Sequence, residues 1–199
     1  MTLRHHKKIR TRQAIVDAAT ELFATRGYEK TTVADIAAAA DIGTRTFFSY
    51  FASKEELLFP QADARVAAAA DAIATRKPGE GPAEVLVRAL REAGASDDDL
   101  VSPLARLRLE LIRTVPAVRG RGLQIQVDAQ REIARHLRDA YPDELDEVSA
   151  AALVGALVGA VSGALQVLLD DPDAVAGGPE LLKERLRRAT DVALRPWER

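Results

Sequence analysis

From residue 9 onward, the apolar side chains of this chain recur with the period of an α-helix, and no segment alternates convincingly as a β-strand. The first apolar face is formed at spacings i, i+3, i+4, i+7 and i+8 by Ile15, Ala18, Ala19, Leu22 and Phe23. Arg26 and Gly27 are expected to end this helix, because a cation suits the last turn and glycine accepts a left-handed cap. Alanine, the most frequent residue, also favours helix over sheet. The pattern predicts an all-α protein.

Two helix starts bracket the aromatic-rich stretch GTRTFFSYF, Gly43 to Phe51. The segments Thr32–Asp35 and Ser53–Glu56 both have the form of a capping box, in which a hydroxyl and a carboxylate satisfy free backbone N–H groups. A lone strand between two helices would have no partner for its backbone, so a short helix is predicted there. A helix, a tight turn and a second helix over residues 32 to 50 form the geometry that enters the DNA major groove.

The aromatic side chains of this short helix are expected to have two roles. Projected at 100° per residue, Phe47 and Phe51 lie on one side and anchor the helix to its domain. The other surfaces carry arginine for guanine, hydroxyls for phosphates and base edges, and a lysine near a helix start. The predicted DNA contacts are Thr32, Thr44, Arg45, Thr46, Phe48, Ser49, Tyr50 and Lys54. An ordinary helical hairpin with a solvated face is the alternative interpretation.

Charge is distributed unevenly along the chain, whose formal net charge is -2. Five Lys and Arg residues precede the first acidic residue, Asp17, and form a basic N-terminal arm over residues 1–12. A basic head on an acidic body indicates an anionic partner for the head, although a solvated charged tail gives the same pattern. The absence of cysteine excludes disulfides, thiol nucleophiles and thiolate metal sites, and no apolar signal segment precedes residue 14. These features fit a cytoplasmic protein.

The run TTVADIAAAADIGTRTFFSYFASKEELL, residues 31–58, closely resembles the DNA-binding domain of the tetracycline-repressor-like (TetR) family of bacterial transcriptional regulators. The preceding RQAIVDAATELFATRGY resembles the first helix of that family. The positions in register are Gly27, Thr32, Ile36, Ala37, Phe47, Phe48, Tyr50, Phe51, Ser53, Lys54 and Glu55. Three positions depart from the family pattern: Asp41 where glycine is common, Gly43 in place of a hydroxyl cap, and Ser49 in place of a larger residue. Asp41 is therefore expected to adopt a left-handed conformation.

The resemblance implies a homodimeric repressor with two domains in each subunit. A three-helix helix-turn-helix domain over residues 1–53 would bind a near-palindromic operator. A helical domain over residues 54–199 would bind a small-molecule effector and dimerise through its last two long helices. No cofactor and no metal are implied. The effector would release the repressor from its operator.

Downstream prolines and glycines divide the chain into further helices, predicted at about 82–93, 103–114, 121–140, 143–170 and 179–195. The uncharged segment Ser149–Leu169 is long enough to cross a bilayer, but acidic residues flank it at both ends and no nearby cation would orient it. Glycines at 155, 159 and 163 form a smooth stripe against which another helix can pack closely. We therefore expect a buried helix that contacts its own domain and a second copy of the chain, with a monomer core helix or a membrane span as alternatives.

The residues that an enzyme would need are few. His136 is the only histidine outside the N-terminal tail, and its arginine neighbours place it on a helix surface. The acidic runs lack a cation-binding loop motif, and no phosphate loop or serine nucleophile motif occurs. The sequence therefore predicts a protein that is not an enzyme and has no catalytic residues. A helical enzyme and a membrane-associated helical protein remain the alternative classes.

Two expectations concern regulation. Pro60 falls inside the helix expected after Ser53, where it removes a backbone hydrogen bond, and we expect a kink or interruption there. The hypothesis is that this joint moves the head when an effector binds, with a local kink of no regulatory meaning as the alternative. An effector pocket is expected within residues 82–169 and lined by apolar side chains, which suggests a hydrophobic ligand. Polar candidates, each of which also fits a surface position, are Arg106, Arg108, Glu110, Arg113, Gln126 and Gln130.

Overall fold

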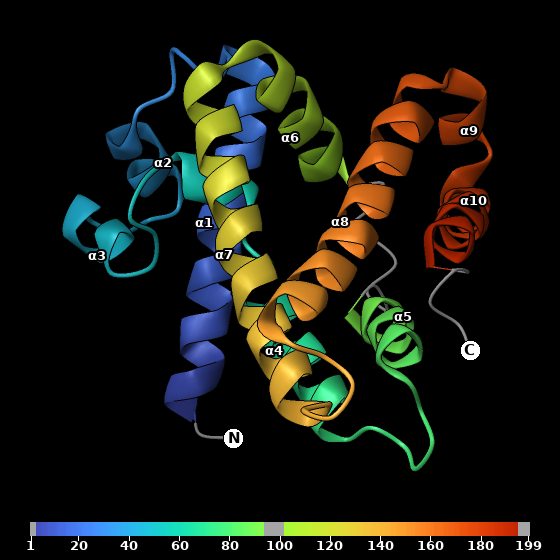
Figure 1. The fold of residues 1–199 in the computed structure, drawn as a ribbon. Helices are drawn as coiled ribbons and strands as arrows, with labels where there is room; N and C mark the ends of the chain where they lie inside the picture. The colour runs from blue at the N-terminus through green and yellow to red at the C-terminus, as the bar shows by residue number, and fades with distance from the viewer. Residues whose placement is uncertain (1–2, 94–101, 195–199) are drawn as a thin grey trace. The chain divides into compact units, whose positions relative to one another are not determined.

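The computed structural model describes residues 3–93 and 102–194, and this part of the chain is helical and contains no strand (Figure 1). The all-α prediction is thereby confirmed. The chain forms two compact units, which we call unit 1 and unit 2. Unit 1 comprises residues 1–60 and 103–122, and unit 2 comprises residues 61–102 and 123–199. The predicted division of function between residues 1–53 and 54–199 stays a prediction.

Unit 1 contains the helices of the N-terminal part and one later helical corner. Its elements are α1 (Leu3–Arg26), α2 (Val33–Ala39), α3 (Thr44–Phe48), the 3₁₀ helix η1 (Glu55–Leu58), α6 (Pro103–Thr114) and the first turns of α7 (Pro116–Ala140). The core joins Ile15 and Phe23 of α1 to Phe47 of α3 and to Leu57 of η1. Leu104 and Leu111 of α6 and Val118 of α7 complete the same core. The α6–α7 corner is thus part of the hydrophobic core of the head.

The turns of unit 1 follow the sequence prediction closely. Gly27 ends α1 with φ +86°, a conformation that glycine adopts without steric cost. Thr32 caps α2 through a complete capping box with Asp35. Asp41 has φ 53°, which confirms the expected left-handed turn before α3. Gly43 is the N-cap of α3 and supplies no side-chain hydrogen bond.

The structure corrects two predictions in unit 1. The basic segment expected as an arm is helical from Leu3, because it continues into α1. The capping box expected at Ser53 does not form: η1 has Lys54 as its N-cap, and the Glu56 carboxylate accepts a hydrogen bond from the Ala52 amide instead. Pro60 lies between the end of η1 and the start of α4, so the predicted interruption of the helix is confirmed.

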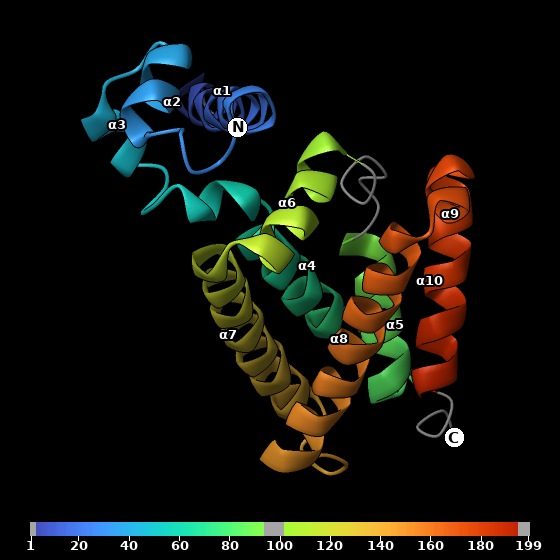
Figure 2. The same ribbon diagram turned by 90° about the horizontal axis from the view of Figure 1, so that it is seen from above.

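Unit 2 contains α4 (Ala62–Ala74), α5 (Pro82–Ala93), the rest of α7, α8 (Glu147–Asp170), α9 (Pro172–Ala176) and α10 (Gly178–Leu194). Helices α8 and α10 lie side by side in two views, and α4 packs on α5 (Figure 2). The predicted ranges for α5 and α6 are correct. Helix α8 begins at Glu147 instead of 143, because the Asp146 side chain caps it, and α7 begins at Pro116 instead of 121.

Helix α8 contains the apolar segment for which the sequence allowed a dimer contact, a monomer core or a membrane span. By length and composition this helix alone among the described residues would suffice to cross a bilayer, a property shared by core helices of water-soluble proteins. Leu153, Val154 and Leu157 are buried in the core of unit 2. Only 22% of its most apolar window is buried, however, and Val148 and Val167 are exposed. Much apolar surface of α8 therefore faces outward from its unit.

Candidate nucleic-acid interface

Helix α3 divides its side chains between the core and the surface. Phe47 and Phe51 are almost fully buried, and their ring centroids lie 6.0 Å apart. Phe48 is 57% exposed and makes an edge contact with the ring of Phe47. Because Phe47 is the one buried residue of this five-residue helix, the other faces of α3 stay accessible. This is the arrangement expected of a helix that presents side chains to a partner.

The exposed face of α3 consists of Thr44, Arg45 and Thr46, together with Phe48. Hydroxyls and a guanidinium beside one another can donate to phosphate oxygens and to acceptors on base edges. Ser49 is exposed, but its hydroxyl donates to the backbone oxygen of Thr46. Tyr50 is only partly exposed and packs against the core of unit 1. Four of the predicted contacts therefore form one exposed surface, while Ser49 and Tyr50 also have contacts within the domain.

Lys54 has contacts within the protein that the sequence did not indicate. Its ammonium group donates to the backbone oxygens of Tyr28, at 3.1 Å, and Thr31, at 3.3 Å, and lies 4.1 Å from the ring centroid of Tyr28. The Tyr28 hydroxyl donates to the Glu55 carboxylate. Burial and this hydrogen bond raise the pKa of Tyr28, while the same bond holds the pKa of Glu55 below its ordinary value despite burial. The contacts among Tyr28, Lys54 and Glu55 join the α1–α2 turn to the start of η1.

Thr32 lies at the start of α2, where its side chain is engaged in the capping box. Hydrogen bonds from the Thr32 hydroxyl and amide hold the pKa of Asp35 below its ordinary value. Thr32 is exposed, so its position at the N-terminus of α2 is compatible with a phosphate contact. Its structural role as a cap is independent of that contact.

Sequence reasoning missed several arginines in unit 1 that bind backbone oxygens or a carboxylate. Arg12 donates to Tyr50 and Pro60, Arg108 donates to Leu58, and Arg121 pairs with the Glu56 carboxylate. Burial lowers the pKa of Arg108. The partners lie 38 to 65 residues away, and a carbonyl acceptor exists at every residue, so no local sequence signal could have identified these contacts.

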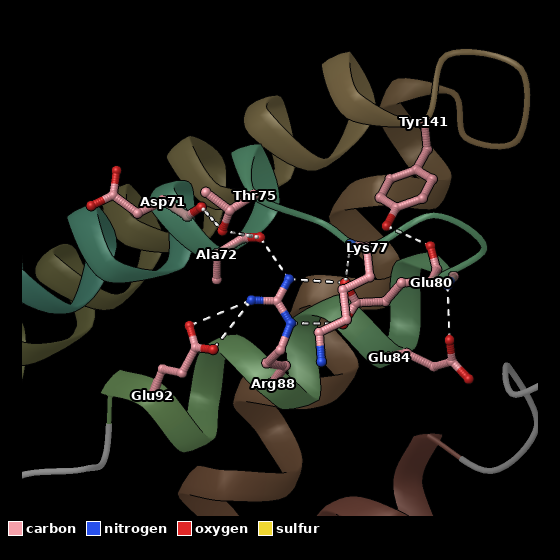
Figure 3. Close-up of polar contacts among 10 residues, drawn as sticks. Asp71, Ala72, Thr75, Lys77, Glu80, Glu84, Arg88, Glu92 and Tyr141 are labelled. Atoms are coloured by element: carbon pink, nitrogen blue, oxygen red, sulfur yellow. Dashed lines mark hydrogen bonds and ion pairs between the residues drawn. The ribbon is translucent and has the colours of Figure 1, made fainter.

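Unit 2 contains an enclosed polar cluster around Arg88 and Glu80 (Figure 3). Their side chains are 18% and 10% exposed and meet at 2.7 Å. Arg88 also donates to the backbone oxygen of Ala72, and the Tyr141 hydroxyl donates to that of Glu80. The hydrogen bond from Arg88 lowers the pKa of Glu80 to about 2. The cluster ties the end of α4, the following loop, α5 and the end of α7 together.

A hollow of ≈ 700 Å³ lies beside this cluster, between the α4–α5 loop and the α7–α8 corner. Its lining includes Arg76, Lys77, Glu84, Asp143 and Glu144. This lining is largely charged, unlike the apolar pocket that the sequence led us to expect for an effector. The polar effector candidates Arg106, Glu110 and Arg113 are exposed on α6, whereas Gln126 and Gln130 on α7 are partly buried.

The fold and the exposed face of α3 define an all-α protein with an N-terminal helix-turn-helix. The family model described as "Bacterial regulatory proteins, tetR family" matches residues 15–59, which contain α2, α3 and η1. Over these residues the chain is similar to this family of bacterial regulators. The resemblance stated from residues 31–58 is confirmed.

Two curated relatives extend the similarity. The chain is 37% identical over 120 residues to the HTH-type transcriptional regulator TcmR of Streptomyces glaucescens, an alignment that covers 59% of this chain and 53% of TcmR. It is 42% identical over 48 residues to the HTH-type transcriptional regulator HbdR of Aromatoleum sp. (strain CIB), covering 24% of this chain and 21% of HbdR. The chain thus spans about half the length of the first of these regulators and about a fifth of the second.

Solved structures share the fold. A TetR-family transcriptional repressor, FadR of Thermus thermophilus in complex with lauroyl-CoA, has a TM-score of 0.54 at 24% identity, covering 90% of this chain and 93% of FadR. SmeT, the repressor of a multidrug efflux pump of Stenotrophomonas maltophilia, has a TM-score of 0.56 at 19% identity, covering 93% of this chain and 89% of SmeT. At these identities the likeness concerns the fold alone.

Proposed function

We propose that the chain is a sequence-specific DNA-binding transcriptional repressor of a bacterial cytoplasm, released from its operator by a small-molecule effector. The observation that carries this proposal is the exposed face of α3 in a family-typical helix-turn-helix: Arg45, flanked by Thr44 and Thr46, lies opposite the buried Phe47. An arginine so placed can donate two hydrogen bonds to guanine in the major groove, and the threonines can contact phosphates or thymine methyl groups. Thr32 and Lys54 are proposed as contacts at helix starts.

A gel shift with the DNA upstream of the chain's own gene tests the proposal. We expect specific retardation that weakens as salt increases, because phosphate contacts release counterions. Arg45→Ala should lose about 1 to 3 kcal/mol of specific binding and relax the preference at one base pair. Arg131→Ala, which removes an exposed arginine from α7 in unit 2, is the matched control and should bind like the wild type. Equal binding to operator and random DNA by the wild type would contradict the proposal.

We further propose that the protein acts as a homodimer that pairs through α8 and α10. The apolar surface of α8 that its own unit leaves uncovered supports this, as does the open space around Gly159 and Gly163. Two copies would place their recognition helices roughly 34 to 36 Å apart, or a multiple of that spacing, on a near-palindromic operator. The effector is proposed as a hydrophobic small molecule held in the helical body, and mass spectrometry of ligand retained through purification tests that part.

A further inference from the structure

The guanidinium of Arg12 points into the protein although the residue belongs to the basic N-terminal segment. Nη1 donates to the backbone oxygen of Tyr50 at 2.9 Å, and Nη2 donates to that of Pro60 at 3.2 Å. Its central carbon lies 4.1 Å from the ring centroid of Phe51. One side chain thus makes two hydrogen bonds and a cation–π contact within unit 1.

The Tyr50 oxygen lies just past the C-terminal end of α3, where helical carbonyls lack partners within the helix. A cation at that end also interacts favourably with the helix dipole. The Pro60 oxygen lies between η1 and α4. Arg12 on α1 therefore bridges the end of the recognition helix to the segment that leads out of the helix-turn-helix.

The far end of this bridge is itself fixed by other residues of unit 1. Arg108 of α6 donates to the Leu58 oxygen at 3.2 Å, and Arg121 of α7 pairs with the Glu56 carboxylate. The ring of Phe59 lies 3.0 Å from the position that a Cβ on Gly122 would occupy. Because residues 56–59 are held by α6 and α7, the Pro60 oxygen is a firm attachment point for Arg12.

Helix α3 has few other restraints on its orientation. It is five residues long, its N-cap Gly43 makes no side-chain hydrogen bond, and Phe47 is its one buried residue. The buried rings of Phe47 and of Phe51, which follows the helix, fix α3 against the core but make no directional hydrogen bond. Recognition of base edges requires side chains held within about 0.5 Å of the productive geometry, so a second attachment at the C-terminal end matters for sequence readout.

We propose that Arg12 is a positioning residue for DNA recognition, which orients α3 through the Tyr50 and Pro60 oxygens and does not neutralise a phosphate. This inference rests on the proposed function. The substitutions Arg12→Lys and Arg12→Gln separate the two roles. Lysine keeps the charge but lacks the planar fork that reaches two acceptors, whereas glutamine removes the charge.

The experiment measures binding to a duplex that the wild type selects from a randomised library and to a scrambled duplex, at several salt concentrations. We expect both variants to lose roughly tenfold or more in specific affinity, the size of one lost base contact, while binding to scrambled DNA is unchanged. The slope of log K against log salt should be the same for Arg12→Gln and wild type. A phosphate contact predicts the reverse: lysine restores affinity, and glutamine weakens binding to both duplexes and reduces the slope by about 0.9. That result would overturn the inference.

Separate controls test whether each variant is folded. Binding is measured at a temperature where denaturant titration shows each variant folded, and Arg131→Gln and Arg131→Lys control for the same changes at an exposed arginine of α7. Unchanged specific affinity in both Arg12 variants would refute the positioning role while leaving the proposed function intact. A wild type that selects no sequence from the library would refute both.

Discussion

Phe47 and Phe48 are neighbours in the chain with opposite environments, since the first is fully buried and the second is 57% exposed. Phe47→Ala should lower the free energy of unfolding by about 3 to 5 kcal/mol, because it leaves a cavity in the core of unit 1. Phe48→Ala should change stability by no more than about 0.5 kcal/mol. Urea unfolding followed by circular dichroism measures both. Similar losses from the two substitutions would contradict the assignment of Phe47 as the anchor.

The low pKa of Glu80 predicts that the protein loses stability in acid. Its pKa in the folded chain, about 2, lies below the ordinary 4.5, so protonation favours the unfolded state. The contribution of the Glu80 carboxylate to the free energy of unfolding is therefore fully present above about pH 4.5 and is lost as the pH falls toward 2. Glu80→Gln should be less stable than wild type near neutral pH, and the difference should shrink over that window. Thermal unfolding at pH 7, 4 and 3 measures it, with Glu144→Gln as an exposed control; a difference that does not change with pH would contradict this account.

Individual residues of α3 were predictable where helical periodicity decides their environment. Phe47 and Phe51 share a side in any helix over these residues, so projection alone identified the anchors. Tyr50 and Lys54 were placed at the surface, yet Tyr50 packs on the core and Lys54 binds oxygens of the α1–α2 turn. Those environments depend on which distant segment lies alongside, information that local periodicity does not contain. Their roles at DNA stay predictions.

At the scale of elements, the turn before α3 depends on the backbone of Asp41. Its φ of 53° disfavours side chains with a Cβ, although aspartate tolerates it better than most. Asp41→Ala should therefore lower the free energy of unfolding by about 1 kcal/mol, whereas Asp41→Gly should not. The comparison is made by urea denaturation of the two variants beside wild type. Equal stability of the glycine and alanine variants would mean that this conformation carries no strain.

Proline marked some helix starts correctly, but the starts of α7 at Pro116 and of α8 after its cap Asp146 were missed. Pro82 and Pro103 begin α5 and α6 as expected, because proline suits the first helical position. The start of α7 was missed since the glycines at 120 and 122 argue against a helix. Gly122 gains a tertiary role instead, as its missing side chain admits the ring of Phe59. Contacts of this kind override local propensity.

At the scale of the whole molecule, the open surface of α8 gives a test of association. A Cβ added at Gly159 would have no neighbour within 4 Å in the isolated chain, so a larger side chain fits the monomer. In a dimer paired through α8 it would separate the helices. We expect a dimeric wild type and a weakened dimer for Gly159→Leu by sedimentation velocity. Gly120→Leu, the same change at an open position on α7, should leave association unchanged.

A monomeric wild type at all concentrations would contradict the pairing, as would undiminished association of Gly159→Leu. The sequence indicated a buried helix with a glycine stripe, and the single chain buries 22% of the most apolar stretch of α8. The arrangement of a second copy cannot be predicted from one sequence, because complementarity between two surfaces is not a property of either helix alone.

The contribution of α6 and the start of α7 to the core of unit 1 has a practical consequence for engineering. Leu104, Leu111 and Val118 belong to the same core as the apolar side chains of α1 and η1. The head is therefore encoded by two separate stretches of the gene. A transfer of residues 1–60 alone to another protein would omit the part of the hydrophobic core that residues 103–122 supply. A chimera that carries residues 103–122 with residues 1–60 transfers all of unit 1.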